Sequence, residues 1–380
     1  MALLDPERAL ARWMPRLVGV WRRHFRRPEG PPTLAPREVK EVAAGIRSLS
    51  LGLTRDRALA GARYMDDPRL LGAYLLFYWP VSYAQARSVL GELGRRPREV
   101  LDLGSGPGPM AFAALDAGAP EVTAADRSAP ALALARALAA EAEEALATRS
   151  WSGGTLPDGR FDVILLGHLL NELGGSAPSA IGARAELVER AATQLKPGGS
   201  VVILEPALRD TSRALLAVRD LLVARGFAVR APCLWRGPCP ALVRPTDWCH
   251  AERSWSPPAL LDTLARAAGL HKEALKMSYL VLAPKGEGWP AIPEGRLFRI
   301  VSEPLEGKGR QRFMGCGPEG RMGLALQEKH RTPQNESFFS LHRGDVVAIE
   351  GTEPRGDGLA LTAESAVRVV APAGQPVRGV

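Results

Sequence analysis

The spacing of apolar positions changes twice along the chain, and each change predicts a different kind of structure. Up to about residue 95 apolar residues recur at helical spacing, with a Pro- and Gly-rich break at 28–36 and a stretch, 70–78, too apolar for a surface loop. From Glu99 short apolar runs alternate with helix-like stretches, and beyond residue 295 short strands are punctuated by glycine. We therefore expect three regions: helical over 1–95, alternating α/β over 96–285, and a small β module over 294–375.

The middle region predicts a parallel, doubly wound sheet, because strands and helices alternate regularly. Expected strands are 100–103, 121–125, 161–167, 200–205 and 278–283, and expected helices are 110–117, 129–147, 186–195, 211–225 and 258–268. The regularity stops in a Pro-, Trp-, Arg- and Cys-rich insertion at 227–258. The last region has expected strands at 296–302, 322–327, 345–351 and 359–370. This pattern favours a small antiparallel barrel of OB-like form.

A glycine loop follows the first expected strand of the sheet. The run Val100-Leu-Asp-Leu-Gly-Ser-Gly-Pro-Gly108 allows the backbone to approach a ligand closely, because glycine has no Cβ. Asp126, at the end of the next strand, can accept hydrogen bonds from the two ribose hydroxyls of an adenosine. These features predict a class I (Rossmann-like) methyltransferase fold that binds S-adenosylmethionine. A dinucleotide oxidoreductase is the alternative, but the third glycine position of its fingerprint is missing, and the Lys196-Pro-Gly-Gly199 turn is typical of class I methyltransferases.

The expected cofactor-binding residues lie in the loop, at the next strand end and after the fourth strand: Asp102, Leu103, Gly104, Ser105, Gly106, Gly108, Asp126, Arg127 and His168. Catalytic residues are not assigned. Amino-methylating enzymes often carry (D/N)PP(Y/F/W) after the fourth strand, where this chain reads Gly167-His-Leu-Leu-Asn-Glu172. His168 can be a general base or can pack against the cofactor, and Asn171 and Glu172 can cap the next helix; we favour the structural roles. The sequence does not establish turnover.

The positive charge is concentrated near the N-terminus. The net charge of the 380 residues is +8, and the first 100 residues hold 18 Lys and Arg against 10 Asp and Glu. This surplus favours a polyanionic partner such as RNA, although the base composition of the genome can produce it too. Apolar runs are all shorter than the roughly 20 residues that span a bilayer, and the N-terminal stretch lacks the features of a secretory signal. We expect a cytoplasmic protein that makes no use of a membrane.

Four cysteines make up the remaining candidate chemistry: Cys233, Cys239, Cys249 and Cys316. Three fall within the irregular insertion, which a bound metal can organise. Their spacing matches neither paired zinc knuckles nor common ferredoxin runs. From spacing alone, ordinary reduced thiols and a metal site remain open, and a disulfide framework is not expected in the cytoplasm.

The segment Ala231-Pro-Cys-Leu-Trp-Arg-Gly-Pro-Cys-Pro240, followed by Asp247-Trp-Cys-His250, resembles a family signature. The family is that of yeast mitochondrial ribosomal small-subunit protein twenty-two and methyltransferase-like protein seventeen, of which this chain looks like a bacterial-type member. Tyr64-Met-Asp-Asp-Pro68, Asn171-Glu-Leu173 and Lys276-Met-Ser-Tyr-Leu-Val-Leu282 agree with it, whereas Glu205-Pro206 departs from the family's frequent Glu-Arg-Gly.

The resemblance implies a factor that associates with the small ribosomal subunit and carries a [4Fe–4S] cluster. It places the cluster on Cys233, Cys239, Cys249 and Cys316, with zinc as the alternative metal and His250 nearby rather than as a ligand. The chain is then either an rRNA methyltransferase or a non-catalytic assembly factor, expected to be monomeric. A small-molecule methyltransferase with a structural zinc is the rival. RNA contacts are expected from the basic N-terminal region and from barrel residues near Cys316, although a solvated barrel face can carry such a run of charge too. These barrel residues are Arg296, Arg299, Lys308, Arg310, Arg312 and Arg321.

Overall fold

A computed structural model describes residues 6–175 and 179–377 of the chain, so the first five residues of the expected helical region lie outside it. The helices are α1 Pro6–His24, α2 Pro36–Ser50, α3 Pro68–Ala73, α4 Trp79–Gly91, α5 Pro109–Asp116, α6 Ala129–Ala142, α7 Ser179–Ala192, α8 Arg209–Ala224 and α9 Ala259–Ala268. The strands are β1 Glu99–Leu103, β2 Glu121–Asp126, β3 Leu146–Ser150, β4 Phe161–Gly167, β5 Leu195–Pro206, β6 Ala228–Ala231, β7 Ala251–Ser254, β8 Ala274–Ala283, β9 Leu297–Ile300, β10 Leu305–Gly307, β11 Arg310–Gly317, β12 Gly320–Gln327, β13 Val346–Arg355 and β14 Gly358–Ala371. Short helical turns lie at Leu51–Arg55, Tyr64–Asp66, Tyr74–Tyr78, Leu170–Glu172, Pro240–Leu242, Glu328–His330 and Glu336–Ser340.

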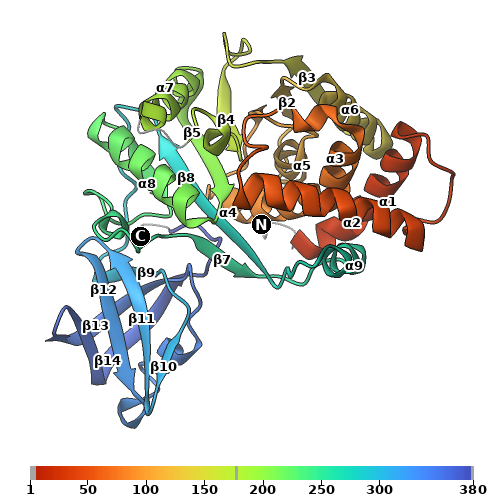
Figure 1. Cartoon of the computed structure of the whole chain (residues 1–380). Helices are drawn as coiled ribbons and strands as arrows, with labels where there is room; N and C mark the ends of the chain where they lie inside the picture. The colour runs from red at the N-terminus through yellow and green to blue at the C-terminus, as the bar shows by residue number, and fades with distance from the viewer. Residues whose placement is uncertain (1–5, 176–178, 378–380) are drawn as a thin grey trace.

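The larger sheet has the strand order β3-β2-β1-β4-β5-β8-β6, with β7 paired to β8 (Figure 1). Strands β1 to β5 pair in parallel, whereas β8 runs antiparallel to both β5 and β6. An antiparallel strand inserted next to the last position is the topology of class I methyltransferases, and it confirms the expected fold class. Because the glycine loop follows β1, it lies at the carboxyl edge of the sheet, where ligands bind in open α/β folds.

Two helical layers cover the sheet, and alternate strand residues face each of them. On β4, Val163 and Leu165 join the core formed with α1 to α6 and α9, while Ile164 and Leu166 join the core formed with α7 and α8. The N-terminal helices thus share their core with the sheet. Trp13 of α1 packs edge-on against Phe112 of α5, with ring centroids 4.9 Å apart.

Arginines of α1 pair with acidic residues of the sheet domain. Arg12 forms ion pairs with Asp116 and with Glu144, the latter at 3.2 Å, and Arg23 pairs with Glu141. Part of the positive surplus that the sequence assigned to a polyanion is therefore used to attach α1 to α5 and α6.

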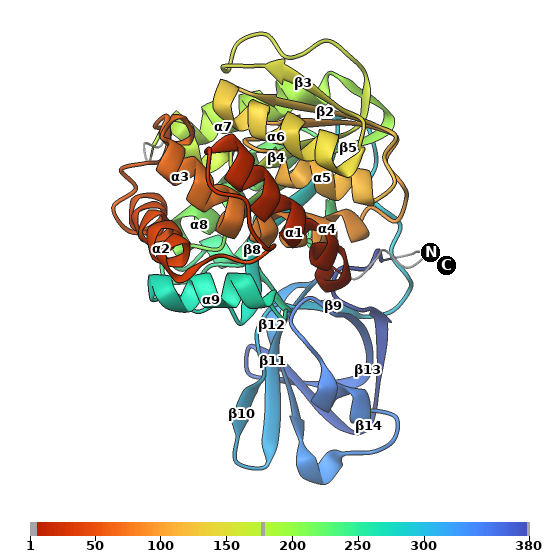
Figure 2. The same cartoon turned by 90° about the vertical axis from the view of Figure 1, so that its right-hand side faces the viewer.

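The C-terminal strands form a second sheet of order β10-β11-β12-β14-β13-β9, with its own core that includes Phe298, Phe313 and Phe338. An additional pairing joins β9, at one end of this sheet, to β11, which is second from the other end, and β12 pairs with β14 in parallel. The sheet is thus closed into the expected small barrel, which lies below the larger sheet in both views (Figures 1 and 2). Its OB-like character stays a prediction.

A buried carboxylate joins the barrel to the rest of the chain. Glu92, just after α4, is 7% exposed and accepts from Arg299 of β9 (Nη2 to Oε2, 3.1 Å), from Arg253 of β7 (Nη2 to Oε1, 3.3 Å) and from the hydroxyl of Tyr279 in β8. Arg299 is itself buried, so the expectation that it lies on an RNA-facing surface is not met.

Several strands differ from the sequence prediction. The helix expected over 129–147 ends at Ala142, because Glu143 adopts a left-handed φ of 56° and the chain then forms β3. Strands β6 and β7 lie inside the stretch expected to be irregular, and β10 and β11 were not predicted. β3 and β7 bury few side chains, so they carry no apolar alternation that the sequence could reveal. None of the helices within the described residues has the length and apolar content needed to cross a membrane.

Candidate functional site

The glycine loop between β1 and α5 depends on residues without a side chain. Gly104, Gly106 and Gly108 have φ values of 75°, 52° and 81°, which glycine adopts without strain. A Cβ on Gly104 would lie 2.9 Å from Cδ1 of Leu169. The amides of Gly104 and Ser105 both donate to the carbonyl of Ala125, at 2.8 and 3.1 Å, which fixes the loop to the end of β2.

A cavity of about 230 Å³ opens beside this loop. Of the residues expected to bind the cofactor, Asp102, Gly104, Ser105, Gly106, Asp126, Arg127 and His168 line it. Leu103 and Gly108 do not: Leu103 packs in the core under α7 and α8, and Gly108 caps the start of α5.

Two carboxylates at strand ends line the cavity, and each accepts hydrogen bonds from backbone amides. Asp102 accepts from the amide of Ala111 at 2.9 Å, and burial raises its pKa to about 7. Asp126 accepts from Gly106 N and Ser128 N, both at 2.8 Å, and burial raises its pKa as well. A carboxylate has about four lone-pair positions, so Asp126 retains acceptor capacity for a ribose.

The cavity is covered by the segment 61–66, whose role the sequence analysis did not identify. Arg127 donates to the carbonyls of Gly61 and Ala62, and the Tyr64 hydroxyl donates to Glu172 Oε1 at 3.1 Å. Burial raises the pKa of Glu172 to about 7. The run Tyr64-Met-Asp-Asp-Pro68, noted above only as part of the family resemblance, was the available signal.

His168 lies at the inner end of the cavity in a left-handed conformation, with φ of 57°. Its Nε2 is 3.3 Å from the hydroxyl of Ser82, and its carbonyl accepts from the side chain of Asn171 at 2.8 Å. Burial, with a smaller effect of Lys272, lowers the pKa of His168 to about 4. The imidazole is therefore neutral near pH 7, with Ser82 at its Nε2 and Asn171 on the backbone of the same residue.

The four cysteines lie around a second cavity of about 70 Å³, between α8, β8 and the barrel. The loop that carries three of them is organised by α8. Arg219 donates to the carbonyls of Trp235 and Gly237, and Asp220 accepts from the amide of Cys239 at 2.8 Å. Six residues before Arg219 on the same helix, Arg213 donates to the carbonyls of Ala241, Arg244 and Asp247.

The four thiols line this cavity without forming a compact metal-holding group. Within the described residues, no group of three or more His, Cys, Asp or Glu side chains is placed to hold a metal ion. Burial is the main cause that raises the pKa of Cys239 to about 12 and that of Cys249 to about 11, and the other thiols add to both shifts. The pKa values of Cys233 and Cys316 are raised by burial too.

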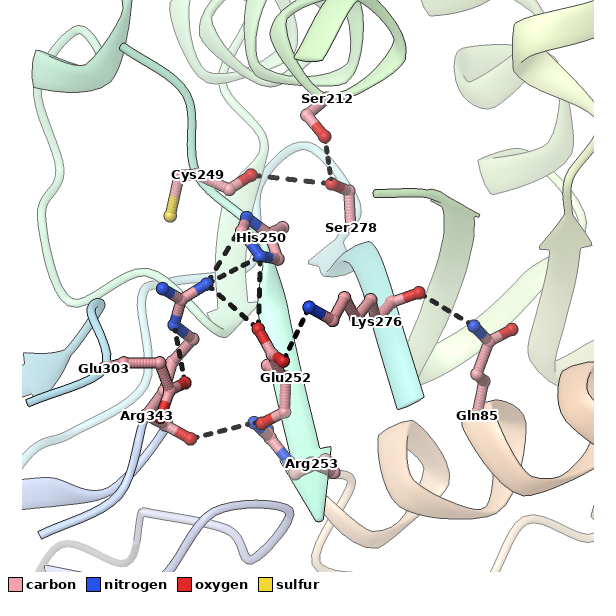
Figure 3. Close-up of polar contacts among 10 residues, drawn as sticks. All are labelled: Gln85, Ser212, Cys249, His250, Glu252, Arg253, Lys276, Ser278, Glu303 and Arg343. Atoms are coloured by element: carbon pink, nitrogen blue, oxygen red, sulfur yellow. Dashed lines mark hydrogen bonds and ion pairs between the residues drawn. The ribbon is translucent and has the colours of Figure 1, made fainter. Parts of the chain in front are cut away.

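His250 lies beside the cysteine cavity and interacts with groups other than the thiols (Figure 3). Its ring stacks on Trp248 at 4.3 Å, and its Nε2 lies 2.6 Å from Nη1 of Arg343. Burial and the charge of Arg343 lower its pKa to about 4, so the neutral ring accepts a hydrogen bond from the guanidinium. Arg343 belongs to the barrel, and Glu252, 3.6 Å from His250 Nε2, also pairs with Lys276 at 2.9 Å.

Solved structures similar to this chain include several methyltransferases. A ribosomal protein L11 methylase from Lactobacillus delbrueckii subsp. bulgaricus is 18% identical, with a TM-score of 0.33, and the match covers 53% of this chain and 80% of that one. A methyltransferase from Pyrococcus furiosus is 14% identical, with a TM-score of 0.35, over 53% and 81% of the two chains. TrmN from Thermus thermophilus is 26% identical, with a TM-score of 0.32, over 40% and 46%. These scores are low, so we base the fold assignment on strand order.

A search of curated proteins found no match to the sequence. A family model does match, over residues 70–345, and its description is mitochondrial small ribosomal subunit Rsm22. The matched range includes helix α4, the glycine loop, all four cysteines and the first strands of the barrel. The chain belongs to the Rsm22 family.

Proposed function

We propose that this protein is a factor for the small ribosomal subunit that binds S-adenosylmethionine and carries a [4Fe–4S] cluster. The family's description names the small ribosomal subunit. The observation that carries the proposal is that four cysteines, three from the sheet domain and one from the barrel, line a single cavity.

The first cavity fits S-adenosylmethionine. The backbone of Gly104 to Gly106 would lie against the methionine part, since this segment lines the cavity and its two glycines carry no side chain. Asp126 would accept from the ribose hydroxyls, and Arg127 and Tyr64 would keep the covering segment in place. The bound molecule supplies an activated methyl group when an acceptor is present.

The donor set of the second cavity fits an iron–sulfur cluster. Four thiolates are the usual ligands of a [4Fe–4S] cluster, one for each iron. Four thiolates can also hold a single tetrahedral zinc, so the metal content of the purified protein has to distinguish the two. Guanidinium groups of Arg299, Arg321 and Arg343 line the same cavity and offset the negative charge that four thiolates bring.

Metal analysis tests the cluster. Protein purified without oxygen should be brown and contain about four irons and four sulfides per chain, and Cys316→Ser should lower the iron content. Ser340→Ala, an exposed position of the same barrel, is the matched control and should keep all its iron. Stoichiometric zinc without iron would contradict the cluster.

We propose RNA contact for strand β11 and the turn that precedes it. Lys308, Arg310 and Arg312 are exposed on and beside β11 and form no ion pair within the described part of the chain. Replacing all three by Gln should weaken co-sedimentation with small subunits and reduce the slope of log K against log salt by about 2 to 3. The matched control replaces three exposed arginines of the helices, Arg190, Arg209 and Arg266, and should change neither.

Methyl transfer separates the two forms of the proposal. Tritium that passes from labelled S-adenosylmethionine to small-subunit RNA identifies an rRNA methyltransferase. Binding without transfer to any RNA identifies an assembly factor that uses the cofactor for stability. Absence of small-subunit binding at low salt would contradict both.

A further inference from the structure

Two arginines lie on either side of Cys316 across the barrel strands. Cys316 of β11 is the register partner of Arg299 on β9 and of Arg321 on β12. Directly opposed residues of antiparallel strands share a face of the sheet, with Cβ atoms about 5 Å apart. All three residues line the cysteine cavity, so the fourth thiol lies between two guanidinium groups.

Both guanidinium groups keep buried N–H donors without a partner. The terminal nitrogens of Arg299 are used by Glu92 and by the carbonyl of Gly344, at 3.0 Å, but its Nε lacks a hydrogen bond to any described residue. Arg321 leaves both Nε and Nη1 without one, since the nearest carboxylate oxygen, Asp247 Oδ2, is 3.5 Å from Nη1. A buried donor without an acceptor costs about 1–3 kcal/mol, more when charged, so these three donors point to an absent acceptor.

An iron–sulfur cluster offers such acceptors on its surface. It exposes inorganic sulfides as well as thiolates, whereas a zinc site offers thiolates alone. Hydrogen bonds to the sulfurs and nearby positive charge are among the factors that set the reduction potential of a cluster. Both favour the reduced form, because it carries more negative charge.

We propose that Arg299 and Arg321 donate hydrogen bonds to the sulfurs of the bound cluster, position it against Cys316 and raise its reduction potential. The inference rests on the proposed cluster and adds these residues' role to it. Arg299 also links the cluster to Glu92, and through it to the end of α4.

The test uses full-length protein with its cluster, in the wild type and in Arg321→Gln and Arg321→Lys. In the Gln variant, the ratio of reduced to oxidised cluster at a fixed potential should fall at least tenfold. For a one-electron couple this corresponds to a reduction potential lower by about 59 mV. The Lys variant, which keeps the charge and loses the planar donors, should shift it less. Arg368→Gln, at an exposed arginine of β14 in the same barrel, is the matched control and should stay within twofold of the wild type.

A second measurement needs no variant. Fe–S stretching bands of the wild-type cluster should move after exchange into D₂O, because guanidinium protons on the sulfurs exchange. Bands that do not move would overturn the inference, whether or not the variants retain their cluster. An unchanged reduction potential in the iron-loaded Gln variant would also overturn the inference. Neither result would contradict the proposed cluster itself. Only a protein purified without iron would do so.

Discussion

Glu205, at the end of β5, should make the stability of the protein fall as pH rises. Its side chain is 1% exposed, and Oε1 accepts from the amides of Leu170 and Asn171 at 2.9 and 3.4 Å. Its Oε2 is buried and has no hydrogen-bond partner among the described residues. Burial raises the pKa of this carboxyl from 4.5 to about 8.

The sign of the effect follows from linkage. Below pH 4.5 the carboxyl is protonated in both folded and unfolded chains, and it costs no stability. Between the unfolded pKa of 4.5 and the folded pKa of about 8 the unfolded chain ionises first, so stability is lost as pH rises. From pH 5 to pH 8 the loss amounts to about 3 kcal/mol.

Glu205→Gln removes the ionisable group and keeps the acceptor for the two amides. The free energy of unfolding, measured in urea by tryptophan fluorescence at pH 5 and pH 8, should therefore fall less in this variant than in the wild type. The difference between the two proteins should grow by about 3 kcal/mol over that range. Glu186→Gln, at an exposed position of α7, is the control and should follow the wild type at both pH values. Parallel curves for Glu205→Gln and wild type would refute the reasoning.

Three further predictions concern the cofactor cavity and the barrel contact. Gly104→Ala should lower affinity for S-adenosylmethionine at least tenfold in calorimetry, because its Cβ meets Leu169 at 2.9 Å and its φ is 75°; unchanged affinity would place the ligand elsewhere. Asp126→Asn should weaken binding of S-adenosylmethionine by about 1–2 kcal/mol through lost acceptors for the ribose, with equal loss for S-adenosylhomocysteine; a loss confined to one of them would contradict this role. Glu92→Ala should leave Arg299 buried without its partner and cost about 3–5 kcal/mol, detected as faster proteolytic release of the barrel; wild-type resistance would show that the ion pair does not hold the barrel.

The sequence revealed the parts of the site that are local in the chain. Gly104, Gly106 and Asp126 were found because a strand, a tight turn and the next strand end follow one another within about 25 residues. The covering segment 61–66 was not found as part of the site, because it reaches the cavity through contacts across more than 60 residues, such as Arg127 to Gly61. No periodicity encodes such a contact.

The cysteine cavity shows a different limit. Spacing alone left ordinary thiols and a metal site open, and only the family resemblance grouped Cys316 with the three others. Arg299 was expected among exposed basic residues, yet it is buried and donates to Glu92. The sequence could not reveal this, because charge alone does not show which side of a strand faces a neighbouring domain. Arg12 and Arg23 of the N-terminal region likewise have acidic partners that the sequence does not reveal, Asp116 in α5 and Glu141 in α6.

The division of the cysteines between two parts of the chain also bears on the order of events during synthesis. Cys233, Cys239 and Cys249 leave the ribosome well before Cys316, and the cavity wall needs Arg299 and Arg321 from the barrel as well. The complete set of four thiols therefore exists only after the barrel has been made, has folded and has docked on the sheet domain. A nascent or truncated chain has at most three of them, so a filled cavity would mark a molecule whose translation and folding are both finished.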